Sequence, residues 1–227
     1  MSGSRGRTAR ADRLAETREA IMSSAERLFA EHGLSAVSNR QIGEAAGQGN
    51  VTAVSYHFGS KAGLVRAIMV KHGEEVDRIR RPYVEEAADS HDIRGWVDCL
   101  VRPVPEHLGS LGTPSWHARF AVQVMTDPLM RAIVIDEALV RTHLRQTLDG
   151  LGRCLHRLSA QVRAERGDMA RHLIIHTCAE QERALAEGSA PLHSSWERTA
   201  DALSDAIVGL LTAPVTAPRN HLANTGP

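Results

Sequence analysis

The chain has 227 residues, of which 42% are apolar and 24% charged, and its acidic and basic side chains are equal in number. This composition is that of a globular protein, long enough for one large domain or a small domain joined to a larger one, and it excludes a disordered or fibrous chain. No segment approaches the roughly 20 apolar residues of a membrane span, and Cys99, Cys154 and Cys178 form no Cys-x-x-Cys pair. We therefore expect a cytoplasmic protein with no membrane partner, disulfide framework or structural zinc site.

The charge is distributed unevenly along the chain. Residues 1–73 carry ten Lys and Arg side chains against six Asp and Glu, whereas the remainder carries 17 against 21. Residues 1–13, "MSGSRGRTARADR", hold four arginines and show no apolar pattern. We expect a disordered basic arm there, either a solvated tail or a segment that follows a nucleic-acid groove.

Two helices are predicted after this arm. From Thr17 to Gly33 apolar residues recur with helical spacing, as at Ile21, Ala25 and Phe29. In "SNRQIGEAAG", Ser38 and Gln41 form a capping-box pattern, and Gly47 marks the end of a short second helix.

The next stretch, "GNVTAVSYHFGSK", is rich in β-branched and aromatic residues and resembles a strand. On a helix, however, Val51, Val54 and Phe58 fall within one narrow sector, and Thr52 and Tyr56 lie almost opposite. A strand would need a pairing partner that the flanking sequence does not indicate. We therefore predict a short third helix, followed by a fourth that Ser60 caps.

The second helix, the tight turn and the short third helix form a helix-turn-helix, which the first helix packs against. We therefore predict a helix-turn-helix unit over residues 14–59 and a connecting helix over 60–80. The exposed side of the third helix carries small and hydrogen-bonding groups that can enter a major groove. His57 and Lys61 suit phosphate contacts, as do the backbone amides of the fourth helix. For Tyr56 and His57 the alternative is packing in a half-buried position.

At these residues the sequence resembles the TetR family of bacterial transcriptional regulators, in "AERLFAEHGLSAVSNRQIGEAAG" (25–47) and "AVSYHFGSKAGLVRAI" (53–68). The resemblance implies an all-α fold, in which an N-terminal three-helix DNA-binding domain is joined to a larger helical ligand-binding and dimerisation domain. One departure is the additional "QG" at Gln48 and Gly49, which makes the start of the third helix harder to align. The expected DNA-binding residues are Ser38, Arg40, Asn50, Thr52, Ala53, Ser55, Tyr56, His57 and Lys61.

Helical patterns continue over residues 81–213, which we expect to form the larger domain, and residues 214–227 are expected to be disordered. One long amphipathic helix is predicted over 131–158, and two final helices over 168–186 and 194–211. Some residues of this domain mix aromatic surface with polar groups, as small-molecule sites do, although ordinary core packing is an alternative for each. These candidate ligand residues are Trp96, His107, Trp116, His117, Phe120, Met125 and His143.

A helix-turn-helix protein usually reads DNA as a two-fold dimer, because one short helix contacts few bases. The resemblance implies an intersubunit four-helix bundle formed by the last two helices, and the alternative is that their apolar stripes face only their own core. The expected dimer residues are Leu173, Ile174, Thr177, Trp196, Ala200, Leu203, Ile207 and Leu210.

The sequence thus predicts a homodimeric transcriptional regulator, which binds a palindromic double-stranded DNA operator, needs no cofactor and responds to an unidentified small-molecule effector. We favour a repressor, and an activator of the same fold stays open. A different class is a helical metal-dependent enzyme, since His172 and His176 have the i, i+4 spacing of zinc ligands, but the Glu of a His-Glu-x-x-His motif is absent. Zero net charge argues against a non-specific architectural DNA binder.

Overall fold

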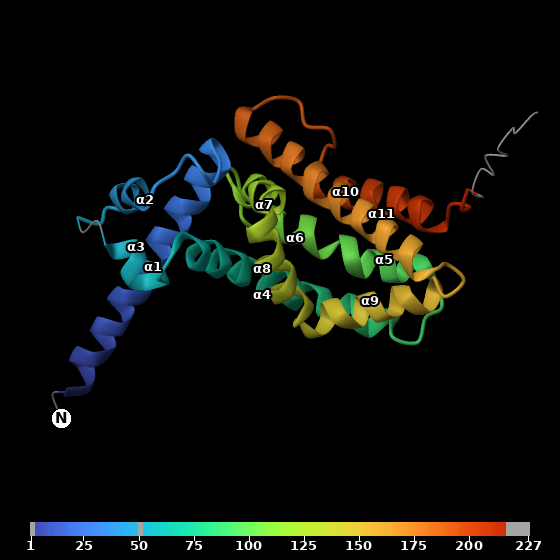
Figure 1. Cartoon of the computed structure of the whole chain (residues 1–227), viewed down its shortest axis with the longest axis horizontal. Helices are drawn as coiled ribbons and strands as arrows, with labels where there is room; N and C mark the ends of the chain where they lie inside the picture. The colour runs from blue at the N-terminus through green and yellow to red at the C-terminus, as the bar shows by residue number, and fades with distance from the viewer. Residues whose placement is uncertain (1–2, 50–51, 217–227) are drawn as a thin grey trace, which may run out of the picture.

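The computed structural model describes residues 3–49 and 52–216, and every regular element among them is an α-helix. Figure 1 shows α1–α3 at one end, with α4 leading from them into the remaining helices. The elements are α1 (Gly3–His32), α2 (Asn39–Ala45), α3 (Ala53–Phe58), α4 (Lys61–Ala87), α5 (Ile93–Val101), α6 (Pro103–Ser110), α7 (His117–Thr126), α8 (Pro128–Leu139), α9 (Thr142–Cys154), α10 (Ala160–Glu187) and α11 (Trp196–Thr212). The predicted all-α fold is confirmed. None of the described helices combines the length and apolar character needed to cross a membrane.

Several helix ends lie where the sequence places them. Ser38 caps α2 with the complete capping box to Gln41, and Gly47, at φ 68°, ends the turn after this helix. The side chain of Ser60 caps α4 by accepting a hydrogen bond from the backbone amide of Gly63. These caps are local, so the residue types alone indicate them.

Other boundaries differ from the expectation. α1 begins at Gly3, where a disordered arm is predicted, because the Arg and Ala residues of this segment favour a helix and no proline interrupts it. α4 continues to Ala87 instead of ending near residue 80. The helix predicted over 131–158 is divided into α8 and α9, because Asp77 of α4 binds the free amides of His143 and Leu144 and so starts a new helix. Of the tail predicted to be disordered, residues 217–227 lie outside the described part.

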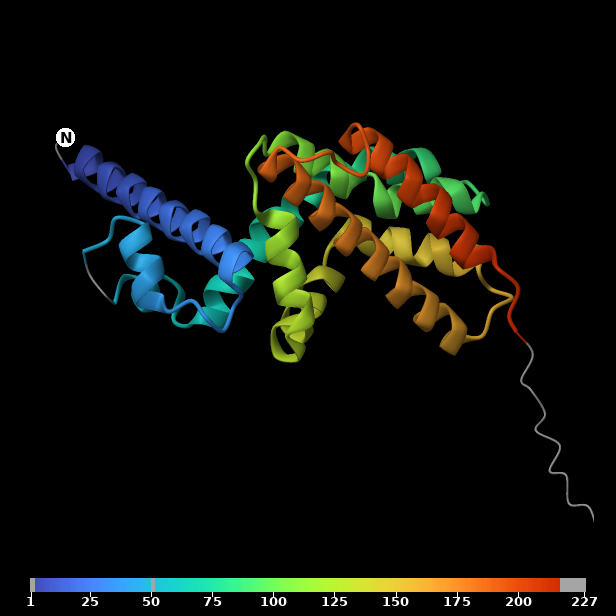
Figure 2. The same ribbon diagram turned by 90° about the horizontal axis from the view of Figure 1, so that it is seen from above.

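Two hydrophobic cores hold the helices together. The first core surrounds Ile21, Phe29 and Leu64 of α1 and α4, and it also takes in Phe120 and Val124 of α7. The second core surrounds Trp96 and Val97 of α5 and is covered by α9, α10 and α11. In Figure 2, α7 and α8 lie between the N-terminal helices and the pair α10 and α11. α7 therefore connects the two cores.

Buried charged side chains satisfy helix ends on other helices. The carboxylate of Glu182 in α10 accepts hydrogen bonds from the backbone amides of Ala118 and Arg119, in the first turn of α7. Arg166 of α10 donates to the carbonyl of Leu211 at the end of α11. Such contacts between distant residues offset the cost of burying unpaired helix termini.

Candidate nucleic-acid interface

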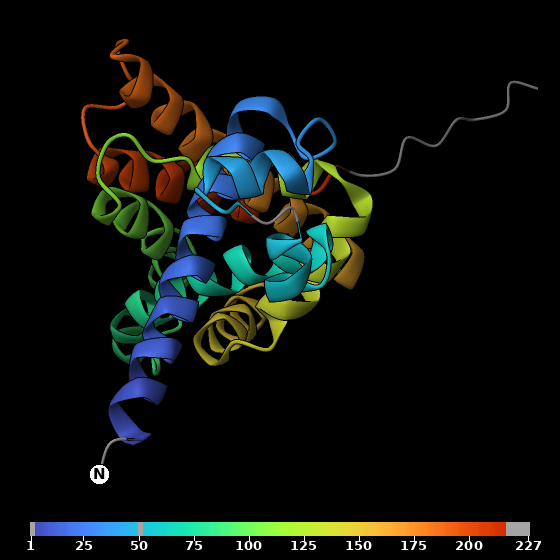
Figure 3. The same cartoon turned by 90° about the vertical axis from the view of Figure 1, so that its left-hand side faces the viewer.

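α3 is presented at the surface by α1, α2 and α4. Figure 3 shows α1, α2 and α3 at the front when the molecule is seen from this end. Val54 of α3 is fully buried, and Phe58 packs against the same core. Arg18 of α1 lies over the Phe58 ring, 4.4 Å from its centroid, and donates a hydrogen bond to the backbone carbonyl of His57. α3 is therefore fixed at its apolar side and at its end.

The outward side of α3 carries Tyr56, whose side chain is 75% exposed, together with exposed Ser55 and the preceding Thr52. The ring of His57 makes an edge contact with Tyr56, with 5.0 Å between ring centroids, and it is half-buried. Hydroxyl and phenol groups so placed can donate to and accept from base edges or phosphates.

One predicted contact residue has other surroundings than expected. Ala53 is buried, because α3 is only six residues long and is enclosed by α2 and α4 on more than one side. Asn50 lies outside the described residues, as does Val51. Ala53, which is among the expected DNA-binding residues, is therefore not on the outward side of α3.

Lys61 was expected to contact phosphate, but its ammonium group points back into the protein. Lys61 Nζ donates to the carbonyl oxygens of Leu34 at 2.9 Å and Val37 at 2.6 Å, in the loop between α1 and α2. Ser38 and Arg40 are exposed at the start of α2, where the Ser38 hydroxyl is part of the capping box and Arg40 Nε donates to Glu44 at 2.8 Å.

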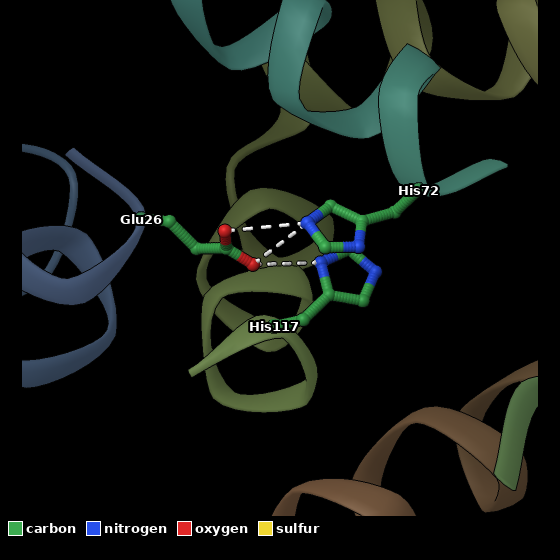
Figure 4. Close-up of side chains that lie close together, drawn as sticks. All are labelled: Glu26, His72 and His117. Carbon is green, nitrogen blue, oxygen red and sulfur yellow. Dashed lines mark hydrogen bonds and ion pairs between the residues drawn. The ribbon is translucent and has the colours of Figure 1, made fainter. Parts of the chain in front are cut away.

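The structure also reveals a polar cluster at the junction of α1 with α4, α6 and α7. His72 Nε2 and His117 Nδ1 each lie 3.1 Å from Glu26 Oε1, and His72 Nδ1 lies 2.8 Å from His107 Nε2. Figure 4 shows the carboxylate reaching from α1 to the edges of two stacked rings, which come from α4 and α7. The rings of His72 and His117 are stacked, with centroids 3.7 Å apart and planes at 17°.

Burial and mutual contact shift the pKa values of this cluster. Burial would raise the pKa of Glu26, but hydrogen bonds to His117 and His72 hold it far below its ordinary value. Burial lowers the pKa of His72, and burial together with the charges of His117 and His72 lowers the pKa of His107 to about 4. The cluster therefore favours an ionised Glu26 and neutral His72 and His107.

The predicted ligand site includes His107 and His117 but lacks Glu26, which is bonded to His117 and His72. The available signal was a carboxylate on the apolar side of α1, since Glu26 stands between Met22 and Phe29 at i, i+4 and i+7.

The other predicted ligand residues are dispersed. Trp96 is buried in the second core, with its Nε1 donating to the Ser90 carbonyl, whereas Phe120 stacks on Phe29 in the first core at a centroid distance of 6.0 Å. His143 binds Asp77, and Trp116 and Met125 are half-buried at opposite ends of α7. Two surface cavities, of about 410 and 380 Å³, are lined by none of the seven predicted residues. Neither cavity therefore corresponds to the predicted ligand site, in which His107, His117 and Phe120 lie near one another.

The predicted dimer stripe faces mostly inward. Ile174, Ala200, Leu203 and Ile207 are buried within the chain, and Thr177, Trp196 and Leu210 are half-buried. Among the expected residues Leu173 is exposed, at 39%, and Met169 one turn before it is exposed at 53%. The alternative that this stripe serves the chain's own core is correct for the four buried residues.

His172 and His176 are exposed on α10, with ring centroids 6.2 Å apart. Within the described ranges, the group of three or more potential metal ligands is Glu26, His72 and His117, and it includes neither of these histidines. The arrangement gives no support to an enzyme built on the α10 pair.

The chain is similar in sequence and in fold to known proteins. Residues 21–68, which run from the C-terminal part of α1 to the first two turns of α4, match the sequence model of the bacterial regulatory proteins of the tetR family. The HTH-type transcriptional repressor AcnR of Corynebacterium glutamicum is 29% identical over 144 residues, which cover 61% of this chain and 69% of AcnR. A TetR-family regulator from Streptomyces coelicolor has a similar fold, with a TM-score of 0.50 and 18% identity, over 87% of this chain and 96% of that one. The helix-turn-helix unit of this chain is thus of the tetR-family type, and the chain is similar in sequence and in fold to TetR-family DNA-binding transcriptional regulators.

Proposed function

We propose that the protein is a homodimeric repressor, which binds a palindromic operator and is released from it by a small-molecule effector. The observation that carries this proposal is the outward side of α3, where Tyr56 is exposed beside Ser55 while Val54 and Phe58 hold the helix to the core. The name of AcnR, a transcriptional repressor, supports repression over activation.

Phosphate contacts complete the proposed interface. The N-terminus of α4 and the capped N-terminus of α2 offer backbone amides at the same end of the molecule as α3. Arg40 lies exposed on α2, and its guanidinium can exchange its contact with Glu44 for a phosphate, because that surface ion pair is worth little. Residues 1–73 carry the basic excess of the chain, which attracts the nucleic-acid backbone.

The dimer is proposed to form through the outer faces of α10 and α11. Met169 and Leu173 are exposed apolar side chains on α10, and the outer side of α11 carries the small residues Ala206 and Gly209, which allow close helix approach. Two copies joined there present two α3 helices to successive half-sites.

Effector binding must favour an arrangement in which the two α3 helices no longer match the operator. The surface cavity of about 410 Å³ has the size of a small-molecule site, and apolar and polar residues both line it. Its lining comprises His91, Asp92, Ile93, Cys154, Leu155, Arg157, Leu158, Leu211 and Thr212. α7 provides a route to the DNA-binding end, since Glu182 of α10 binds its first turn and Glu26 of α1 binds His117.

The recognition side of α3 is tested with Tyr56→Ala. A genome-wide footprint of the full-length protein identifies the operator, and fluorescence anisotropy then measures affinity for that duplex. We expect a loss of at least about tenfold, because an exposed contact to DNA is removed while the core is untouched. Thermal unfolding should be unchanged.

Two variants serve as controls for this experiment. Tyr56→Phe separates the hydroxyl from the ring, and Gln146→Ala removes an exposed side chain of α9, outside the proposed DNA-binding and dimer faces, which should leave DNA affinity unaltered. Wild-type operator affinity in Tyr56→Ala would show that α3 does not read DNA through this side.

A further inference from the structure

We propose that Glu26, His72 and His117 form a binding site for one divalent transition-metal ion of the zinc class, which joins α1 to α4 and α7. Two imidazole nitrogens and a carboxylate oxygen are a donor set that binds Zn²⁺ and leaves a fourth position open. The three donor atoms lie within 4.8 Å of one another. The carboxylate oxygen and each nitrogen, 3.1 Å apart, need to separate by only a few tenths of an ångström to reach the roughly 3.4 Å between ligands of a tetrahedral zinc ion.

The charge of Glu26 supports this site. Its side chain is 14% exposed, and its contacts within the described residues are the two imidazoles, with no Lys or Arg paired to it. Lys71, the neighbour of His72, is paired with Glu19 instead. A buried carboxylate needs a positive partner, which is here either a proton on an imidazole or a bound cation.

His107 supplies the outer support that metal-bound histidines commonly have. With His72 Nε2 directed at the ion, the proton of His72 lies on Nδ1 and is donated to His107 Nε2, 2.8 Å away. His107 then carries its own proton on Nδ1, a buried atom with no hydrogen-bond partner in the described part of the chain. This contact fixes the tautomer and the ring orientation of His72.

Metal binding requires one ring to move. An ion must lie near the plane of each imidazole that binds it, and two rings stacked with planes 17° apart cannot both satisfy this condition. Because His107 holds His72, the ring that turns is that of His117, the first residue of α7. Metal binding thus replaces the stacking of His72 and His117 with coordination of both rings to the ion. The ion then joins α7 to α1.

The binding test uses the metal-free, full-length protein with Zn²⁺ in competition with a chromophoric chelator, and with Co²⁺ as a spectroscopic probe. We expect one ion per chain and a tetrahedral Co²⁺ absorption spectrum. Glu26→Gln, which keeps a hydrogen-bonding side chain, and His117→Gln should each weaken binding by at least about tenfold.

The matched control is the double variant His172→Gln, His176→Gln, because this exposed pair on α10 also has zinc-binding spacing. Its affinity for the ion should equal that of the wild type. The proposal is overturned if the wild type binds no ion, if the control loses binding, or if both Glu26→Gln and His117→Gln bind as tightly as the wild type.

If Glu26→Gln and His117→Gln do not fold, the wild type is titrated with Zn²⁺ while the NMR signals of its imidazole groups are monitored. Signals of His72 and His117 must shift at one equivalent, and a shift confined to His172 and His176 would contradict the site. These measurements contain no DNA, so their outcome does not depend on the proposed function. A failed metal site and a failed DNA-binding face are thus told apart.

Discussion

Lys61 lies in the first turn of α4, and its ammonium group reaches the carbonyl oxygens of Leu34 and Val37. The side chain is half-buried, so two of its three donors act within the protein rather than toward solvent. Lys61 thereby holds the loop before α2 against α4, and its contribution to DNA binding is proposed to be the position of α2.

Lys61→Met should therefore act first on stability. Two carbonyls lose a charged donor, and we expect the free energy of unfolding to fall by about 1–3 kcal/mol, as measured by urea denaturation. The salt dependence of operator affinity should keep its slope. A slope reduced by about one, with unchanged stability, would instead assign Lys61 to a phosphate.

Arg40→Met provides the comparison for this prediction. Arg40 and its partner Glu44 have side chains 73% and 60% exposed, so losing the pair should change stability by less than about 1 kcal/mol.

At the scale of helices, the described ends fall into two kinds. Ser38 and Ser60 directly precede the helices that they cap, and each accepts a hydrogen bond from the backbone amide three residues later. The sequence predicts both caps. Glu182 and Asp77 instead bind the first turns of α7 and α9 from more than 60 residues away. No local pattern reports which distant carboxylate reaches a helix end, so the division between α8 and α9 was missed.

The same distinction explains the candidate site. Helical spacing placed Tyr56 outward and Val54 inward, because α3 follows the ordinary period. Burial of Ala53 depends on how α2 and α4 enclose a short helix, and the cluster at Glu26 depends on four helices meeting. Periodicity predicts which side of a single helix is buried. The burial of Ala53 and the cluster at Glu26 depend instead on how several helices pack together, which periodicity does not report.

Asp77→Asn tests a helix end that is bound from another helix. Asp77 accepts from Leu144 and pairs with Arg80, whose side chain is 5% exposed. Loss of the charge leaves this arginine buried without its counterion, and we expect destabilisation of about 2–4 kcal/mol. The matched control Glu85→Gln removes an exposed partner of Arg81 and should cost less than about 1 kcal/mol.

The effect of Asp77→Asn should depend on pH. Burial would raise the pKa of Asp77, but hydrogen bonds from His143 and Leu144 and the charge of Arg80 lower it below its ordinary value of 3.8. The carboxylate thus stabilises the fold fully above the unfolded-state pKa, and this contribution is lost as the pH falls through the folded-state pKa. Urea denaturation at pH 7 and at about pH 3 should show the wild type approaching the variant in acid, and a constant difference would contradict this assignment.

At the scale of the whole molecule, the inward face of α10 and α11 is separate from the face proposed for dimerisation. Leu173→Arg places a charge on the outer face and should give monomers in analytical ultracentrifugation, with the fold retained in circular dichroism. Ile207→Ala opens a cavity in the second core and should lower the free energy of unfolding by about 2–4 kcal/mol. If the Leu173→Arg variant is still a dimer, the interface lies outside this outer face.

The packing of Phe120 and Val124 against Phe29 also makes the N-terminal helices depend on α7. A fragment that ends after α4 would lack α7 and would expose the surface of α1 that these side chains cover. Grafting the helix-turn-helix unit onto another sensor domain therefore requires either transplanting α7 with it or redesigning the uncovered side of α1. For this chain, the practical unit of exchange is a discontinuous one, which joins residues from the beginning of the sequence to a helix near its middle.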